Sequence, residues 1–367
     1  MKKVFCVILV ISALFAAGCP VYAVSAKAAV VINGDTGDIL YSKNADVRLP
    51  MASTTKIMTA LILLENCADL DGEIVTAKEM VTVEGSSMGL LEGDRVSYRA
   101  LLYGMMLASG NDAANTVAIA IGGSVEKFVG MMNAKAAELN LKSTYFVTPS
   151  GLDAEGHYTT AYELALITRE ALKNPDFALA AAAKSATLCY GNPPYRRTLT
   201  NHNRLLFMYD DVIGVKTGFT KKSGRCLVSA AKKDGKYVIA VTLNDGDDWA
   251  DHRFLLDAGL GAIEVYDYKQ ESKTVSIPVI GGEFEAVEGV AGAAGFSITK
   301  GQDVKIAVCA PRFLYAPVEE NAVVASIEYY GAGRLLYKSN VTVKRVGEKK
   351  ISKLNLFFEI FKIILGS

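Results

Sequence analysis

The sequence predicts an α+β protein of two domains followed by a distinct C-terminal tail. Two strand-like runs near the N-terminus are joined by a turn, and residues 52–261 are mostly helical in pattern, with two strands after position 210. Beyond about 267 the pattern changes to short apolar runs separated by glycine. A chain of 367 residues is more typical of two domains than of one.

The composition is that of a globular protein without a strongly charged partner. Hydrophobic residues make up 51% of the chain and charged residues 21%, which is ample for a core. Lysine plus arginine and aspartate plus glutamate both number 39. This balance gives no indication of nucleic acid as a partner.

The first residues have the pattern of an export signal. Lys2 and Lys3 precede an apolar run from Val4 to Ala17, and Val21-Tyr22-Ala23 matches a small-x-small cleavage site. We therefore predict a signal peptide over residues 1–26, cleaved near 23–26, and an exported protein. Two alternatives are a retained membrane anchor, for which the run is short, and a lipoprotein acylated at Cys19.

The elements expected next in the chain begin with a hairpin. The turn Gly34-Asp35-Thr36-Gly37 separates two apolar or alternating runs. Helical residue content, two strand runs around Lys233-Asp234-Gly235 and a final helix follow. The predicted strands are Ala28 to Asn33, Asp38 to Ser42, Arg225 to Lys232 and Lys236 to Leu243, and the predicted helices are Ile57 to Leu64, Tyr98 to Ala108, Val125 to Leu139, Thr160 to Leu172 and Trp249 to Leu256.

The last hundred residues divide into a β-rich domain, predicted over 267–346, and a tail over 349–367. Strand-like runs in the domain are Thr274 to Val279, Val304 to Cys309 and Ala322 to Tyr329. The tail is amphipathic as a helix, with an apolar face that includes three phenylalanines and with lysines on the other side. It is too short and too charged to span a membrane but suits a membrane interface. The alternative is a helix docked on the protein's own core.

Four cysteines lie beyond Cys19, at positions 67, 189, 226 and 309. They show no C-x-x-C spacing and lie far apart, so they do not indicate a metal site. They could form disulfides in an oxidising compartment or serve as small apolar residues. Both possibilities stay open.

The first motif of interest is Ser53-Thr54-Thr55-Lys56. If a helix covers Thr54 to Leu64, the two end residues lie one turn apart, and a neutral lysine can act as the base for a serine nucleophile. The same Ser-x-x-Lys spacing occurs at Ser229-Lys232 and Ser297-Lys300. The Ser229 pair falls in a predicted strand, where residues three apart face opposite sides, so it cannot cooperate.

Two further motifs supply the other groups of an acyl-transfer site. Ser109-Gly110-Asn111 follows a helical run and offers a hydroxyl for proton transfer and an amide for a substrate carbonyl. Lys216-Thr217-Gly218 ends the strand-like run Val212 to Val215, where lysine and a hydroxyl can hold a carboxylate and glycine lets a ligand approach. Alone, each also fits an ordinary turn.

A different hydrolase motif must be weighed. Gly85-Ser86-Ser87-Met88-Gly89 matches the G-x-S-x-G nucleophile elbow, and His157, His202 and His252 lie downstream. That elbow requires a strand before it and a helix after it. The sequence that follows is a poor helix start, so we reject a Ser-His-Asp hydrolase.

In their order, the three motifs resemble those of the penicillin-interacting serine enzymes. Pro50-Met51-Ala52 before Ser53 and Asn111 to Asn115 after the second motif sharpen the resemblance to D-alanyl-D-alanine carboxypeptidases, the low-molecular-mass penicillin-binding proteins. Tyr103-Gly104, the Gly85 to Gly89 loop, His157 to Leu166 and Asn201 to Leu206 also fit this pattern. The resemblance covers about residues 28–265. It implies a β-lactamase/transpeptidase-like domain over 27–265, with an antiparallel sheet flanked by helices and a helical subdomain.

The resemblance also implies a role for each motif residue. Ser53 is acylated by the penultimate D-alanine of a peptidoglycan stem peptide, Lys56 is the general base and Ser109 assists protonation of the leaving amine. Asn111 positions the substrate amide, and Lys216, Thr217 and Gly218 form the carboxylate site. The backbone N–H groups of Ser53 and Phe219 form the oxyanion hole.

No metal or cofactor is implied, and β-lactams are expected as inhibitors. The tail would hold the exported enzyme peripherally on the outer face of the cytoplasmic membrane. Two departures from relatives bear on rate and substrate preference. Phe219 stands where some relatives have histidine, and Asp245 to Trp249 stands where some have an arginine for the carboxylate.

Two alternative functions remain. A β-lactamase of similar fold would need a deacylating carboxylate in a Glu-x-x-x-Asn arrangement, which the stretch from Pro149 to Leu172 lacks. A non-catalytic peptidoglycan-binding scaffold would not need Ser53, Lys56, Ser109 and Lys216, which are all present.

Overall fold

The computed structural model describes residues 23–268, 274–281, 285–292 and 294–345. These residues form two compact units. The first comprises the residues up to Ile32, Ile39–Lys232 and Val238–Gly261, and the second Asn33–Asp38, Lys233–Tyr237 and the residues from Ala262 onward. Most of the predicted signal peptide and the predicted amphipathic tail lie outside the described residues.

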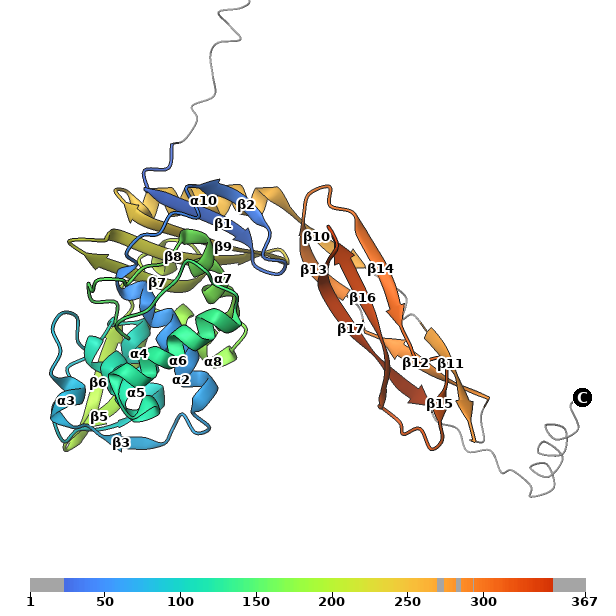
Figure 1. The fold of residues 1–367 in the computed structure, drawn as a ribbon, viewed down its shortest axis with the longest axis horizontal. Helices are drawn as coiled ribbons and strands as arrows, with labels where there is room; N and C mark the ends of the chain where they lie inside the picture. The colour runs from blue at the N-terminus through green and yellow to red at the C-terminus, as the bar shows by residue number, and fades with distance from the viewer. Residues whose placement is uncertain (1–22, 269–273, 282–284, 293, 346–367) are drawn as a thin grey trace, which may run out of the picture. The chain divides into compact units, whose positions relative to one another are not determined.

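A five-stranded sheet in the order β2-β1-β9-β8-β7 forms the centre of the first unit (Figure 1). Its strands are β1 (Ala28–Asn33), β2 (Ile39–Lys43), β7 (Val212–Thr220), β8 (Gly224–Lys233) and β9 (Lys236–Asp245). The pairs β1–β2 and β7–β8 are antiparallel. β1 is buried along its whole length, as expected for an almost continuous apolar strand that is covered on both faces.

Helices cover the two faces of this sheet, as Figure 1 shows. On one face, α10 (Asp248–Ala262) packs so closely that Gly259 lies against Val31 and Val238. On the other face, α2 is almost wholly buried and contacts α4 to α8. These helices are α2 (Lys56–Asn66), α4 (Tyr98–Met106), α5 (Asn111–Gly122), α6 (Val125–Glu138), α7 (Ala161–Ala171) and α8 (Pro175–Ala182), with short α3 (Lys78–Val81) and α9 (Leu205–Met208) beside them.

Local capping explains where several of these helices begin. The side chains of Ser97, Ser124 and Thr160 each accept a backbone N–H from the first turn of α4, α6 and α7. Asn174 caps α8 in the same way, with Pro175 at its first position.

The predicted helices and the predicted hairpin at Gly34–Gly37 are confirmed, with α10 running to Ala262, beyond the predicted end at Leu256.

The prediction that residues 52–261 are mostly helical before position 210 left out several elements of the structure. A second, four-stranded sheet in the order β3-β4-β5-β6 lies there, and α8 was not predicted either. Its strands are β3 (Glu73–Val75), β4 (Arg95–Ser97), β5 (Ser185–Gly191) and β6 (Pro194–Thr200). β3 and β4 are too short to show a period, and β5 and β6 carry few apolar residues, so hairpin pairing rather than a hydrophobic pattern defines them.

The second unit is built from strands around its own core. A β10–β13 pair accompanies a six-stranded sheet in the order β14-β16-β17-β12-β11-β15. The first strand begins at Ile263, ahead of the predicted start at 267, because pairing with β13 extends it back to the end of α10. The strands are β10 (Ile263–Tyr268), β11 (Thr274–Ile280), β12 (Ala286–Ala291), β13 (Ala294–Thr299), β14 (Val304–Cys309), β15 (Leu314–Tyr315), β16 (Val323–Gly331) and β17 (Arg334–Arg345).

Aromatic residues fill the centre of the second unit's core. Phe296 stacks on Tyr337 at 5.3 Å between ring centroids and meets Tyr329 edge-on. In the same unit, the Ser297 hydroxyl donates to Asn33 Oδ1 at 3.1 Å. Ser297 is fully buried, so this Ser-x-x-Lys pair has a structural role.

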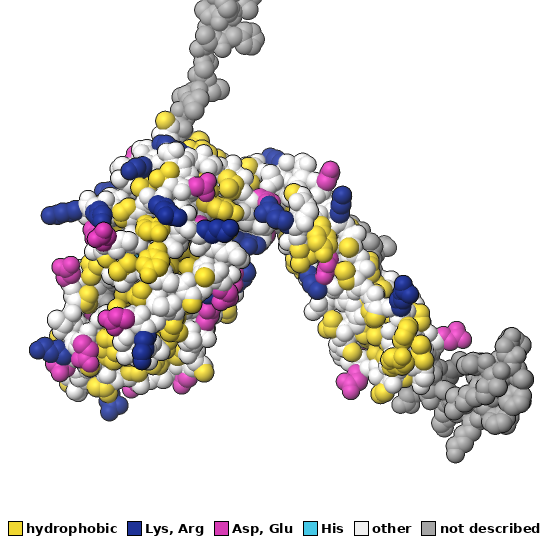
Figure 2. Space-filling view, viewed as in Figure 1, with side chains coloured by type: hydrophobic (Ala, Val, Ile, Leu, Met, Phe, Trp, Pro, Cys, Tyr) yellow, Lys and Arg dark blue, Asp and Glu magenta, His cyan; other side chains and the backbone are white. Residues whose placement is uncertain are grey.

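The cysteines and the surface give further constraints. All four cysteines among the described residues are free thiols, and only Cys226 is buried. Figure 2 shows Lys/Arg and Asp/Glu side chains of both signs interspersed on the face in view, in keeping with the balanced composition. Within the described part of the chain, no helix has the length and apolar composition needed to cross a membrane.

Candidate active site

Ser53 and Lys56 meet at the start of the buried helix α2. The 3-10 turn η1 (Ala52–Thr55) leads directly into α2, so the two side chains lie one turn apart. Lys56 Nζ lies 3.0 Å from Ser53 Oγ. Ser53 therefore sits within a 3-10 turn rather than just before an α-helix, but the predicted proximity of the two side chains is present.

The Lys56 amine is buried among neutral acceptors. Besides Ser53 Oγ, its Nζ donates to Asn111 Oδ1 and to the Ser150 carbonyl, each at 2.7 Å. Burial lowers the pKa of Lys56 well below its usual value, and the charge of Lys216 lowers it further, while Asp112 acts in the opposite direction. A buried lysine with a lowered pKa can take a proton from the neighbouring serine.

Ser109 and Asn111 lie in the turn between α4 and α5. Ser109 is 5% exposed and has φ +58°, a left-handed conformation that turns the chain sharply ahead of α5. Asn111 begins α5, and its amide both accepts from Lys56 and donates to the Glu84 carbonyl at 2.7 Å. Both polar groups of the Asn111 side chain thus form hydrogen bonds within the protein. The hydrogen bond with Lys56 was not predicted from the sequence.

Lys216, Thr217 and Gly218 lie inside β7, which continues to Thr220, so the prediction that the motif ends the strand was wrong. Pairing with β8 through Thr220–Gly224 extends the strand. A side chain at Gly218 would approach the Ser53 nitrogen to 3.0 Å, so only glycine lets β7 lie this close to η1. Phe219 follows immediately and is exposed.

Lys216 is less accessible than its predicted role suggested. It is 1% exposed, and its Nζ donates to the Thr217 carbonyl at 2.9 Å. Burial lowers the pKa of Lys216 to about 7. Near neutral pH, Lys216 is therefore present in both its protonated and its neutral form.

These segments surround one cavity of about 470 Å³. Ser53, Ser109, Thr217, Gly218 and Phe219 line it together, whereas the buried Lys216 does not. Sequence reasoning had not assigned a role to the remaining lining residues, which are Ser86, His202, Arg225, Asp248 and Trp249. Ser86 and His202 come from loops, Arg225 from β8, and Asp248 and Trp249 from the first turn of α10.

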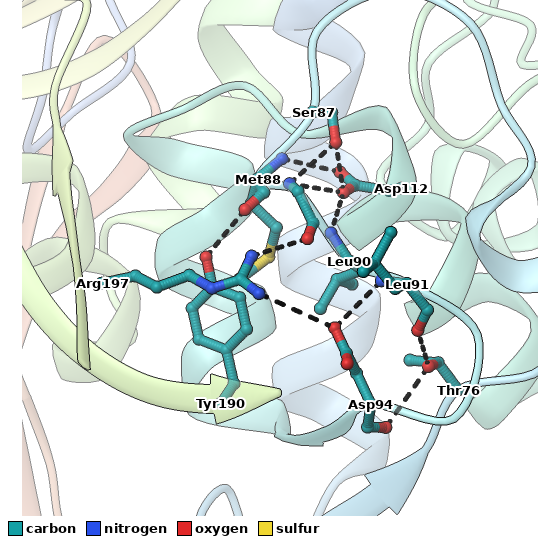
Figure 3. A network of polar contacts seen from close by, with 10 residues as sticks. Thr76, Ser87, Met88, Leu90, Leu91, Asp94, Asp112, Tyr190 and Arg197 are labelled. Atoms are coloured by element: carbon teal, nitrogen blue, oxygen red, sulfur yellow. Dashed lines mark hydrogen bonds and ion pairs between the residues drawn. The ribbon is translucent and has the colours of Figure 1, made fainter. Parts of the chain in front are cut away.

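Asp112 organises the loop that forms one wall of the cavity (Figure 3). This buried carboxylate accepts the Ser87 hydroxyl at 2.6 Å and the backbone N–H groups of Met88, Gly89 and Leu90, each at 3.0 Å. Asn111 N also donates to the Ser86 carbonyl at 2.7 Å. The Asp112 carboxylate and the first residue of α5 thus hold the same loop.

The small sheet holds the same loop from its other side. Tyr190 on β5 donates its hydroxyl to the Met88 carbonyl at 2.7 Å, and Arg197 on β6 donates to the Gly89 carbonyl at 2.6 Å. The segment therefore has neither the strand before it nor the helix after it that a nucleophile elbow requires. The rejection of a nucleophile elbow at this segment is confirmed, and the Ser87 hydroxyl donates its hydrogen bond to Asp112.

His157 positions the loop that carries the Ser150 carbonyl. Its Nδ1 accepts from Val147 N at 2.9 Å, so Nε2 carries the proton and donates to Thr55 Oγ1 at 2.8 Å. Burial lowers the pKa of His157 to about 4, which keeps the ring neutral at physiological pH. Its sequence context fitted the resemblance, but its contact with η1 could not be predicted.

The remaining histidines give no support to a serine–histidine pair at Ser53. His252 is fully buried between Ser229 and Thr242, with 2.5 Å and 2.9 Å to their hydroxyls. Ser229 is therefore part of the core, on the strand in which the sequence placed it. His202 lines the cavity, and burial together with the charge of Lys216 lowers its pKa.

Comparisons with known proteins agree with one another. The profile of the family described as D-alanyl-D-alanine carboxypeptidase matches residues 15–247. The D-alanyl-D-alanine carboxypeptidase DacF of Bacillus subtilis is 33% identical over 331 residues, which cover 87% of this chain and 85% of that protein. DacA of Escherichia coli is 30% identical over 93% of this chain and 87% of its own. A crystal structure of a Streptomyces DD-transpeptidase superposes with a TM-score of 0.63 and 33% identity, covering 66% of this chain and all of the other.

Proposed function

This chain belongs to the D-alanyl-D-alanine carboxypeptidase family of serine peptidases, and we propose that it removes the terminal D-alanine from peptidoglycan stem peptides through an acyl-enzyme on Ser53. The observation that carries this proposal is the 3.0 Å contact between Ser53 Oγ and the buried Lys56 amine. Of the other Ser-x-x-Lys serines among the described residues, Ser229 and Ser297 are fully buried, and Ser124 caps α6 and does not line this cavity. Ser53 lines the cavity described above.

Acylation starts with transfer of the Ser53 proton to Lys56. Ser53 Oγ forms a bond to the carbonyl carbon of the penultimate D-alanine, and the oxyanion is held by the backbone N–H groups of Ser53 and Phe219. The bond to the terminal D-alanine nitrogen then breaks. The Ser109 hydroxyl gives its proton to that nitrogen and regains one from Lys56, so D-alanine leaves as a neutral amine.

Deacylation needs only water and the same base. Water attacks the ester carbon, Lys56 accepts its proton, and Ser53 Oγ leaves as the hydroxyl after taking a proton back. The Streptomyces neighbour is called a DD-transpeptidase, in which an amine takes the place of water. Release of free D-alanine together with a shortened, unlinked peptide distinguishes hydrolysis from transfer.

The proposed binding groups are those of the Lys-Thr-Gly motif together with Asn111. Thr217 and Lys216 bind the terminal carboxylate, and Gly218 leaves room for the peptide backbone beside Ser53. Asn111 holds Lys56 in place and orients the substrate amide. A β-lactam carries a carboxylate and a strained amide at a similar separation, so it is expected to acylate Ser53 and to leave slowly.

The two alternative functions receive less support. In the structure the Lys56 amine contacts a hydroxyl, an amide oxygen and a backbone carbonyl, and none of these is a carboxylate that could activate a deacylating water as in a β-lactamase. A binding scaffold would not require a lysine whose pKa is lowered by burial beside a serine. We therefore place hydrolysis first.

We also propose where the enzyme acts. An export signal over residues 1–26 would place the peptidase domain, 27–265, and the β-rich domain, 267–346, outside the cytoplasmic membrane, where peptidoglycan lies. The amphipathic sequence of 349–367 would hold the enzyme at the membrane surface. Each of these assignments rests on sequence pattern.

The test is the intact mass of the purified mature protein after incubation with benzylpenicillin, with D-alanine release from a D-Ala-D-Ala peptide measured in parallel. We expect one adduct per chain that is absent in Ser53→Ala and present in Ser297→Ala, the matched control from another Ser-x-x-Lys pair. D-Alanine release should disappear with the adduct. An adduct that survives in Ser53→Ala, or the lack of any adduct in the folded wild type, would overturn the proposal of an acyl-enzyme on Ser53.

A further inference from the structure

One permanent charge pair faces the cavity, and its role is not explained by the three motifs. Among the described residues that line the cavity, Arg225 is the only lysine or arginine and Asp248 the only acid. Lys216 lies behind them, buried, with its ammonium donating to the Thr217 carbonyl. The accessible positive charge of the cavity is therefore the guanidinium of Arg225.

The register of the sheet places Arg225 beside the part of β7 that lines the cavity. Arg225 on β8 is the direct partner of Phe219 on β7. Side chains of directly opposite residues share one face of an antiparallel pair, and residues two apart on a strand share a face as well. Arg225, Phe219 and Thr217 thus point to the same side, where all three line the cavity.

Asp248 holds the guanidinium without taking up all of its donors. Arg225 Nη1 donates to Asp248 Oδ1 at 3.0 Å, and the side chain of Arg225 is still 52% exposed, against 7% for Asp248. A guanidinium has five N–H donors, so several remain for a ligand. A long side chain that is already held loses less conformational entropy when it binds an anion.

The charge of Asp248 does not cancel the attraction of Arg225 for an anion. Asp248 lies in the first turn of α10, and its Oδ1 also accepts from Trp249 N at 3.1 Å. The positive end of the helix dipole compensates part of the carboxylate charge at this position. The pair therefore presents a net positive edge to the cavity.

We infer that Arg225 determines specificity by binding the free carboxylate of the substrate's terminal residue beside Thr217, and that Asp248 positions its guanidinium. This inference rests on the proposed carboxypeptidase function and adds to the carboxylate site a residue outside the Lys-Thr-Gly motif. Substrates whose leaving group carries a carboxylate form a charged hydrogen bond with Arg225. Substrates in which a carboxamide replaces that acid do not.

The test compares two N-acyl-D-alanyl thioesters whose leaving groups differ only in carrying a carboxylate or a carboxamide. Thioesters are reactive enough for both to be turned over. A hydrogen bond to a charged group contributes about 1.5–3 kcal/mol, so Arg225→Gln should lower kcat/KM for the acid roughly 10- to 100-fold. The carboxamide should change by less than about threefold, so that the preference for the acid collapses.

Three further variants sharpen the comparison. Arg225→Lys should keep part of the preference, because lysine supplies a charge but no planar fork. Asp248→Asn should weaken it less than Arg225→Gln, since the guanidinium stays but is held less firmly. Arg204→Gln is the charge-matched control, because Arg204 lies over the Trp249 ring at 5.9 Å but does not line the cavity. It should leave the preference unchanged.

The outcomes separate this inference from the proposed function. An equal loss for acid and carboxamide in Arg225→Gln, or a lower melting temperature with the preference intact, would make the pair a structural brace and overturn the inference. If the wild type releases no thiol from either thioester and forms no penicillin adduct, the proposed function itself fails. Acylation of Ser53 in Arg225→Gln at high benzylpenicillin concentration would show that the variant is folded.

Discussion

At the scale of single residues, the site depends on how two lysines are buried. Lys56 contacts Ser53 Oγ and two further neutral acceptors, and Lys216 donates to its neighbour's carbonyl. In both, desolvation is the main cause of a lowered pKa. A lysine that acts as a base must be neutral, whereas a lysine that binds a carboxylate must be protonated, so the two impose opposite pH requirements.

The first prediction concerns pH. Because the pKa of Lys216 is about 7, kcat/KM for a carboxylate substrate should fall as the pH rises through 7, where the free enzyme loses that ammonium. A bound carboxylate favours the protonated form, so kcat itself should fall only at higher pH. Lys216→Arg should abolish the alkaline fall in kcat/KM. A profile that stays flat above pH 7 in the wild type would contradict this assignment.

The second prediction concerns Gly151. It has φ +86°, and a side chain there would overlap the carbonyl oxygen of Ala52, next to the nucleophile. Gly156 has φ +80° but only Val147 near it, at 3.9 Å, so it is the matched control for backbone strain alone. Left-handed strain costs roughly 1–2 kcal/mol in either variant.

We therefore expect both Gly151→Ala and Gly156→Ala to unfold at lower temperature, and only Gly151→Ala to lose activity, by at least about tenfold, through displacement of η1. Melting temperature and D-alanine release measure the two effects. Equal activity losses in both variants would show that the contact with Ala52 is unimportant.

At the scale of elements, the cavity is assembled from ends and edges. η1 supplies Ser53, the turn before α5 supplies Ser109, the edge strand β7 supplies Thr217, and the loop before β4 supplies Ser86. Asp112, one residue into α5, ties that loop to the helix through four donors. A single carboxylate thus links the position of the cavity wall to the position of Asn111.

The third prediction follows from this link. Asp112→Asn removes an acceptor for several buried N–H groups, which should cost about 1–3 kcal/mol in the free energy of unfolding. It also removes the charge that raises the pKa of Lys56, so the acid limb of kcat/KM should move to lower pH. Asp94→Asn is the control, because Asp94 accepts Leu91 N in the same loop but lies outside the Asn111 contacts. Urea unfolding and pH–rate profiles test both effects, and an acid limb that stays in place would contradict the electrostatic role.

At the scale of the whole molecule, the chain folds as two units, and the first begins close to the predicted cleavage site. Val24 and Ala26 are buried at 3% and 0% exposed. Between them, Ser25 N donates to Asp251 at 2.6 Å and the Ser25 hydroxyl donates to Asp245 at 2.7 Å. Burial, reinforced by the neighbouring Asp251, raises the pKa of Asp245 to about 6. This N-terminal segment is therefore an integral part of the first unit.

The fourth prediction is that cleavage occurs after Ala23, so that the mature protein begins at Val24. A chain that begins at Lys27 would lose the burial of Val24 and the donors of Ser25, together about 3–5 kcal/mol. For a unit of this size that corresponds to a melting temperature roughly 6–20 °C lower. Intact mass of the exported protein identifies its first residue, and thermal unfolding compares the two forms. Equal melting temperatures would contradict the structural role of residues 24–26.

The sequence by itself determined the features that depend on neighbouring residues. The two-domain α+β class, the hairpin at Gly34–Gly37, the long helices and the strands on either side of Lys233-Asp234-Gly235 follow from period and turn residues. The family followed from three motifs and their order, because each motif keeps its residues within one helical turn or one strand. The short strands β3 and β4 and the hairpin β5–β6 carry no such period, so they could not be predicted.

Only the tertiary structure decided which side chains share the cavity and which charges remain accessible. Sequence reasoning placed the carboxylate site at Lys216 and Thr217, and only folding shows that the lysine is buried with a lowered pKa and that Arg225 lines the cavity beside Thr217. Asn111 contacts Lys56 across 55 positions, and His157 contacts Thr55 across 102. Burial and long-range contact depend on which distant segments pack together, and no local pattern in the sequence records that.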